Sequence, residues 1–285
     1  MPMYAELVAL IASITTALSS VMATRGMRDS NPDTANLVLT GIQAVILTGL
    51  LVIDVPPLNY TALLWYALAG VCGSFFARLL TMMSYKRIGV SAGSALIGTS
   101  PVVTTILAVL FLGEPLLLAV VLGALCVVSG IACINLKNGQ ISLDWKLVYL
   151  PLGASFLYAL SNIIRKMGTN LQPHAVLGAQ VSTLAGLLAC GVYLVAKDGF
   201  RDLELNRGNV GWLAGAGAVN AVAGITVTMA INLGRVLVAS SIIYSYPLFS
   251  LILSRLMLRD ESYNRYMVVG SGLIVLGVAV VSLFG

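Results

Sequence analysis

Apolar residues fill most of the chain in ten blocks, each long enough to cross a membrane. The blocks cover residues 4–24, 34–53, 61–85, 88–112, 116–135, 146–166, 173–196, 209–232, 235–258 and 262–284. Polar stretches such as RGMRDSNPD, DVPPLNY and KDGFRDLELNRGN separate them. A segment of about 20 apolar residues spans the hydrocarbon core as a helix, because its backbone polar groups must be satisfied internally. The pattern predicts an all-α integral membrane protein with ten transmembrane helices.

One stretch of the chain occurs twice. The segment GSALIGTSPVVTTILAVLFLGE, residues 93–114, is echoed 146 residues later by ASSIIYSYPLFSLILSRLMLRD, residues 239–260, with seven identities in 22 positions. In each copy an apolar run is broken by a proline, Pro101 or Pro247, and closed by an acid, Glu114 or Asp260. The duplication predicts two five-helix repeats, residues 1–137 and residues 138–285.

The number of helices in each repeat has a geometric consequence. Because five is odd, the second repeat enters the membrane from the side opposite the first, so the two repeats are predicted to be inverted. Inverted repeats are a common plan of secondary transporters, in which a site near the membrane midplane is exposed alternately to each side. The pattern therefore favours a transporter.

Composition and charge support this prediction and indicate an orientation. Hydrophobic residues make up 59% of the chain and charged residues 9%, whereas about a quarter of the residues of soluble proteins are charged. The basic residues lie between the apolar blocks, so no nucleic-acid partner is expected. The loops of one side carry twelve Lys and Arg, and those of the other carry Arg165, Lys166 and Arg235. The positive-inside rule then predicts a protein of the cytoplasmic (inner) membrane with both termini outside the cytoplasm.

The repeated motifs resemble the drug/metabolite transporter (DMT) superfamily, in particular its EamA-type branch of ten-helix transporters. The resemblance covers essentially the whole chain and rests on Pro101 with Leu112-Gly113-Glu114, Pro247 with Leu258-Arg259-Asp260, the pair Gly123 and Gly130, and Tyr158-Ala159-x-Ser161-Asn162 followed by Arg165-Lys166. It implies transport of small metabolites. Two features depart from the family pattern. Thr16 stands where many members have an aromatic residue, and members often have cytoplasmic termini, against the charge count.

Arg78 is the main single candidate for substrate binding. It lies eight residues before Lys86, which places it roughly 12 Å inside the membrane boundary at 1.5 Å per residue. An ionisable group at that depth is a candidate for a functional site, with snorkelling or a structural pair as the alternative. Only Glu6 among the acids lies within a membrane boundary, so Arg78 is the one deep charge. A substrate with a carboxylate or phosphate is therefore favoured over a cation.

The two prolines and several polar side chains are further candidates. Pro101 and Pro247 remove a backbone N–H and are expected to kink their helices, either as tolerated kinks or as hinges along the transport pathway. The polar candidates for substrate binding, each of which has an interhelical hydrogen bond as its alternative role, are Thr99, Ser100, Tyr158, Asn162, Asn220, Tyr244 and Tyr246. Glu114 and Asp260 are interpreted as caps of the helices that follow them.

These observations predict a secondary active transporter that exports small polar metabolites, such as amino acids, by alternating access. The alternative is a carrier of phosphate-bearing substrates, such as nucleotide sugars or polyprenyl phosphates, coordinated by Arg78. An enzyme is not expected, because one histidine and no deep acid leave no catalytic constellation. The four cysteines have no metal-like spacing, so no metal or cofactor is expected. Lipids are the expected surroundings, and proton coupling and oligomeric state are left open.

Overall fold

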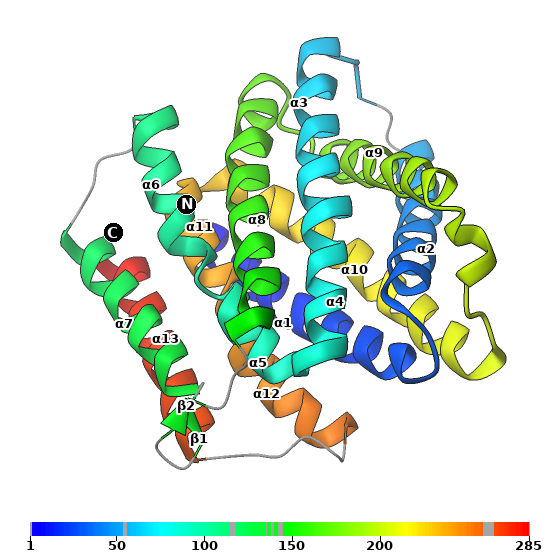
Figure 1. The fold of residues 1–285 in the computed structure, drawn as a ribbon. Coiled ribbons are helices and arrows are strands. Elements are labelled where there is room, and N and C mark those ends of the chain that lie inside the picture. The colour runs from blue at the N-terminus through cyan, green and yellow to red at the C-terminus, as the bar shows by residue number, and fades with distance from the viewer. Residues whose placement is uncertain are drawn as a thin grey trace.

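The computed structural model describes residues 2–53, 56–113, 118–134, 136–137, 140–141, 145–258 and 265–284. These residues are almost entirely helical (Figure 1). The exception is an antiparallel pair of two-residue strands, β1 (Leu136–Lys137) and β2 (Gln140–Ile141). The prediction of a helical membrane protein is thus confirmed.

The part of the chain that the structure describes contains fourteen longer helical segments, which divide into two halves. The first half contains α1 (Pro2–Gly26), α2 (Pro32–Ile53), α3 (Tyr60–Gly70), the π-helical η2 (Val71–Ala77), α4 (Arg78–Ile88), α5 (Val90–Ile97), α6 (Ser100–Leu112) and α7 (Leu118–Ile134). The second contains α8 (Trp145–Leu171), α9 (Ala175–Ala196), α10 (Arg207–Leu233), α11 (Val236–Ile243), α12 (Tyr246–Met257) and α13 (Arg265–Phe284). Short 3₁₀ turns, η1 (Met27–Asp29) and η3 (Gly199–Asp202), follow α1 and α9.

Seven helices or helix runs in the described residues are long and apolar enough to cross a membrane. They are Tyr4–Asp29, Pro32–Ile53, Tyr60–Ile88, Val90–Leu112, Leu147–Leu171, Ala175–Ala196 and Arg207–Leu233. The multi-pass membrane architecture is therefore established, whereas the total of ten spans and the boundary between residues 137 and 138 stay predictions.

Polar residues begin several helices by accepting a backbone N–H. The side-chain oxygen of Asn59 accepts from Ala62 N at the start of α3, and Asn206 forms a capping box with Asn209 at the start of α10. His174 caps α9 through its Nδ1 atom, which accepts from Leu177 N at 3.1 Å. Such caps satisfy N–H groups that the first helical turn leaves unpaired. The predicted caps Glu114 and Asp260 lie outside the described residues.

The two halves pack on each other in a reciprocal pattern. The first helix of the first half, α1, packs along α10, while the first helix of the second half, α8, packs along α3, η2 and α4. Likewise α1 contacts α12, and α8 contacts α6. The last helices of the two halves, α7 and α13, lie side by side at one edge of the molecule (Figure 1). Each helix of one half thus packs on helices of the other half in the same way as its equivalent does. The interior of the protein lies between the halves.

Glycines allow the closest approach of α7 and α13. A Cβ atom at Gly130 would meet the carbonyl oxygen of Gly270, and a Cβ atom at Gly277 would meet that of Gly123. Small residues of this kind let helix backbones approach closely in membranes. Gly130 and Gly277 therefore serve the packing of α7 against α13.

Both prolines of the repeated segment stand at breaks between helices. The helix α5 ends at Ile97 and α6 begins at Ser100, so Pro101 lies in the first turn of α6. In the second half α11 ends at Ile243 and α12 begins at Tyr246, with Pro247 in its first turn. Proline suits the first turn, where no intrahelical acceptor is available for its missing N–H. The expected kinks are in fact full interruptions, which divide each span into two short helices.

Candidate functional site

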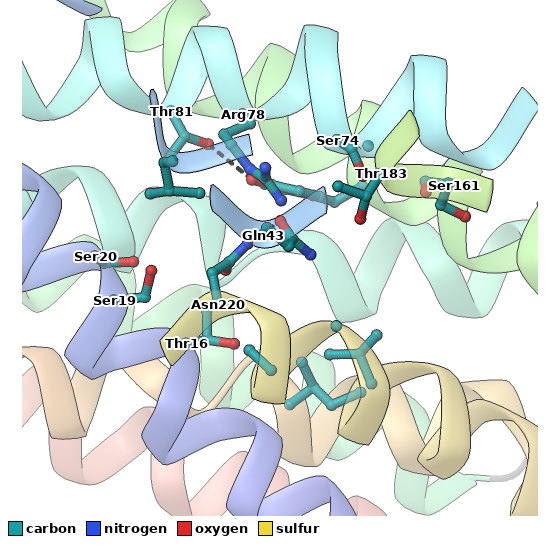
Figure 2. Close-up of a pocket in the computed structure, with 18 of the residues that line it drawn as sticks. Thr16, Ser19, Ser20, Gln43, Ser74, Arg78, Thr81, Ser161, Thr183 and Asn220 are labelled. Carbon is teal, nitrogen blue, oxygen red and sulfur yellow. Dashed lines mark hydrogen bonds between the residues drawn. The ribbon is translucent and has the colours of Figure 1, made fainter. Parts of the chain in front are cut away.

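A cavity of about 130 Å³ lies between the two halves. The helices α1, α2, η2 and α4 of the first half and α8, α9, α10, α11 and the start of α12 line it. Its polar lining residues are Thr16, Ser19, Ser20, Gln43, Ser74, Arg78, Thr81, Tyr85, Tyr158, Ser161, Asn162, Arg165, Ser182, Thr183, Asn220, Tyr244 and Tyr246. Figure 2 shows several of them directed toward a common space.

Arg78 reaches the cavity from the first residue of α4. Its Nη1 atom donates to Thr40 Oγ1 on α2 at 2.9 Å. Arg78 follows the π-helical segment η2, and π segments interrupt the regular register of a helix, often at functional sites. Beside Arg78, Asn220 Nδ2 on α10 donates to Gln43 Oε1 on α2 at 2.7 Å (Figure 2). The depth within the membrane that is expected for Arg78, and the polar groups around its side chain, agree with a position in the cavity.

Arg165 is a second arginine in the cavity, although its place at the end of an apolar block predicted a loop residue. The helix α8 continues to Leu171, so Arg165 lies within it and is only 8% exposed. Its Nη1 atom donates to Thr228 Oγ1 on α10 at 2.9 Å, and its Nε atom has no hydrogen-bond partner among the described residues. The expectation that Arg78 is the one deep charge is therefore wrong. The available signal was the helical spacing of Tyr158, Asn162 and Arg165, which puts the three on one face.

Tyrosines form one wall of the cavity. The rings of Tyr158 and Tyr244 lie 6.1 Å apart between centroids, and those of Tyr244 and Tyr246 lie 6.3 Å apart. The hydroxyls of Tyr246 and Tyr85 lie 3.3 Å apart. Asn162 Nδ2 donates to the Tyr244 hydroxyl at 3.4 Å. Three of these tyrosines, Tyr158, Tyr244 and Tyr246, come from the second half, whereas Thr16 on α1 contributes a hydroxyl and no aromatic ring to the lining.

Some predicted site residues lie away from the cavity. Thr99 and Ser100, at the break between α5 and α6, face α8 instead: the hydroxyls of Thr99 and Ser155 are 2.8 Å apart, and Ser100 Oγ donates to the Ser155 carbonyl at 3.0 Å. Neither residue is part of the lining, and the same holds for Pro101 and Pro247. They lie at or next to the breaks between α5 and α6 and between α11 and α12.

Several lining serines serve packing as well. Ser19 Oγ donates to the Ala216 carbonyl, Ser161 Oγ to that of Ala69, and Ser182 Oγ to that of Tyr66, each at 2.8–2.9 Å. These bonds join α1 to α10, α8 to α3, and α9 to α3.

The electrostatics of the cavity are simple. Arg78 and Arg165 are its charged lining residues, and neither Asp nor Glu is among the lining residues. Arginine remains protonated in proteins. The described residues also contain no cluster of three or more His, Cys, Asp or Glu that could hold a metal ion. The arrangement can bind anionic and polar groups through arginine, amide and hydroxyl donors.

Comparisons with known proteins agree with this architecture. The profile of the EamA-like transporter family matches residues 3–136 and residues 145–283. Twenty-nine chains of solved structures match, and one of them, titled only as the crystal structure of a protein, superposes with a TM-score of 0.72. That structure shares 15% sequence identity, over 96% of this chain and 95% of its own. No curated protein matches the sequence.

Proposed function

The chain belongs to the EamA-like transporter family of the drug/metabolite transporter superfamily, and from that premise we propose that it is a secondary active transporter of small polar metabolites. The observation that carries the proposal is the cavity, because residues of both halves line it and two arginines give it a binding chemistry for anionic groups. A site between two halves is the arrangement that alternating access requires. Inverted repeats, export, and an inner-membrane location with termini outside the cytoplasm belong to this proposal.

The size of the cavity favours small substrates. A cavity of about 130 Å³ is close to the volume of about 150 Å³ that accepts a benzene-sized molecule, whereas drug-sized ligands occupy about 300–1,000 Å³. Amino acids and other small metabolites are of the former size. The space in this conformation therefore argues against nucleotide sugars and polyprenyl phosphates as substrates.

A variant that fills the cavity tests the proposal. Ser20 lines the cavity on α1, and the hydrogen bond that it accepts from Thr24 Oγ1 is made by its backbone carbonyl, which a substitution of the side chain retains. Purified protein in liposomes should show saturable counterflow of small anionic metabolites, and Ser20→Trp should reduce that rate at least tenfold, because the indole occupies the binding space. The matched control is Ile14→Trp on the same helix, where the side chain is 41% exposed. Equal rates for Ser20→Trp and Ile14→Trp would contradict a substrate site in this cavity.

A further inference from the structure

The cavity has a formal charge of +2. Its lining contains Arg78 and Arg165 and no carboxylate. Like charges in a low-dielectric interior repel each other strongly, and an uncompensated charge is costly inside a membrane protein. Because the lining residues supply no negative charge, a bound ligand must supply it if the charges are to be compensated.

Most N–H donors of the two guanidinium groups form no hydrogen bond with the described residues. A guanidinium has five N–H donors, and the described residues accept one from each arginine, through Thr40 and Thr228. Both acceptors are neutral hydroxyls, which orient the guanidinium without cancelling its charge. Arg165 Nε lies buried without a partner among the described residues. Both arginines are thus held in place with most of their donors uncommitted.

The arginines belong to different halves of the molecule. Arg78 stands on α4, and Arg165 stands on α8. A ligand with a single anionic group can pair fully with one of them. A ligand with two anionic groups can pair with both and join the two halves. An amino acid adds an ammonium group to a cavity that already has a charge of +2, with no lining carboxylate to receive it.

We propose that the transported substrate is a small organic dianion, which places one anionic group at Arg78 and the other at Arg165. The inference rests on the proposed transport function and narrows its substrate class. A four-carbon dicarboxylate fits a cavity of about 130 Å³. A small phosphate monoester offers the same charge and size, and the experiment separates these two sources.

A series of matched compounds tests the charge requirement. Succinate, succinamate and succinamide have nearly the same size and charges of −2, −1 and 0 at pH 7.5, and glycerol 3-phosphate supplies the phosphate monoester. Counterflow is measured in proteoliposomes preloaded with each compound. Succinate should have the lowest KM of its series, with an increase of about tenfold for each charge removed. A still lower KM for glycerol 3-phosphate would identify a phosphate monoester as the dianion.

Variants of one arginine connect that preference to the cavity. Arg165→Gln should raise the KM for succinate by about tenfold to a hundredfold, the effect of losing a charge-assisted hydrogen bond, and change the KM for succinamate less. Arg165→Lys retains the positive charge and should keep the preference for succinate, which guards against a variant that fails to fold. Arg87→Gln removes an exposed arginine near the end of the same helix as Arg78 and should leave both KM values unchanged.

The outcomes separate the inference from the function on which it rests. Saturable counterflow of succinamide or serine with a lower KM than that of succinate would overturn the dianion and leave the transporter intact. An Arg165→Gln variant that raises the KM values for succinate and succinamate by the same factor would also overturn it. Saturable counterflow of none of these compounds would overturn both the dianion and the proposed transport of small polar metabolites.

Discussion

The cavity arginines are positioned by neutral partners on neighbouring helices. Arg78 bonds Thr40 on α2, and Arg165 bonds Thr228 on α10. A carboxylate partner would fix a guanidinium more firmly and also cancel its charge. Hydroxyl partners leave the charge available, which is what a site for an anion requires. A third connection, between Asn220 and Gln43, joins α10 to α2 beside Arg78.

The role of the hydrogen bond between Asn220 and Gln43 can be tested with a substitution that adds a single methyl group. A Cβ atom at Gly224 would lie 2.9 Å from Gln43 Nε2. Gly224→Ala should displace the Gln43 amide and raise the KM for the transported compound by about two- to tenfold, the effect of one weakened hydrogen bond. Gly211→Ala, on the same helix with nothing within 4 Å of its Cβ atom, should leave the KM unchanged. An unchanged KM in Gly224→Ala as well would show that this amide pair does not position the substrate.

At the scale of elements, the two broken helices meet across the molecule through serine hydroxyls. Ser94 on α5 and Ser250 on α12 lie 3.0 Å apart between hydroxyl oxygens, and Ser91 and Ser254 lie 3.3 Å apart. Interhelical hydrogen bonds in membranes contribute about 0.6 kcal/mol on average. Contacts of this strength are readily exchanged. The interface between α5 and α12 is therefore well suited to the rearrangement that the proposed alternating access requires.

The breaks themselves should affect the rate of transport. Replacing both Pro101 and Pro247 by alanine restores the N–H groups that can bond the carbonyls of Ile97 and Ile243, and so favours continuous helices. The double variant should lower the turnover rate about fivefold with little change in KM, because a hydrogen bond of about 1 kcal/mol stabilises one state against the other. Pro151→Ala, at a proline inside the unbroken helix α8, is the control. Unchanged counterflow kinetics in the double variant would show that the helix breaks have no role in transport.

At the scale of the whole molecule, a lysine in each half ties the first and third spans together. Lys86 Nζ donates to the carbonyls of Met27 and Ser30, next to the end of α1. Lys166 Nζ donates to the carbonyls of Ile231 and Gly234 at the end of α10. A cation near the C-terminal end of a helix is favourable, because unpaired carbonyls and the helix dipole are concentrated there. Each half thus contains an equivalent lysine contact between its own first and third spans.

The loop charges predict an orientation in the membrane, which can be measured directly. Because Arg165 is buried in α8, the loops with fewer basic residues carry two of them, Lys166 and Arg235, and not three. The difference in positive charge between the two sides of the membrane therefore increases. In a variant without Cys72, Cys126, Cys133 and Cys190, a membrane-impermeant maleimide added to intact cells should label Leu171→Cys and not Arg201→Cys. Both positions are exposed. The reverse labelling would place the termini in the cytoplasm and contradict the charge count.

The sequence alone determined the class of the protein and much of the cavity. Hydrophobic blocks, and a proline at the same place in two copies of one segment, are local features that survive whatever the tertiary arrangement is. They sufficed to predict a helical membrane protein with two repeats. They also singled out Arg78, Tyr158, Asn162, Asn220, Tyr244 and Tyr246, all of which line the cavity, because polar residues inside apolar spans must face protein or an aqueous space.

The tertiary structure decided what depends on which helix lies beside which. Arg165 resembled a loop charge because it ends an apolar run, and only the continuation of α8 beside Thr228 on α10 makes it a cavity residue. Thr99 and Ser100 turn to Ser155 because α8 packs against α6. The π-helical segment before Arg78 contains no proline, so its position is not evident from the sequence. For Arg165, Thr99 and Ser100 the partner is distant in sequence, and a pattern along the chain does not show which distant residue a side chain will contact.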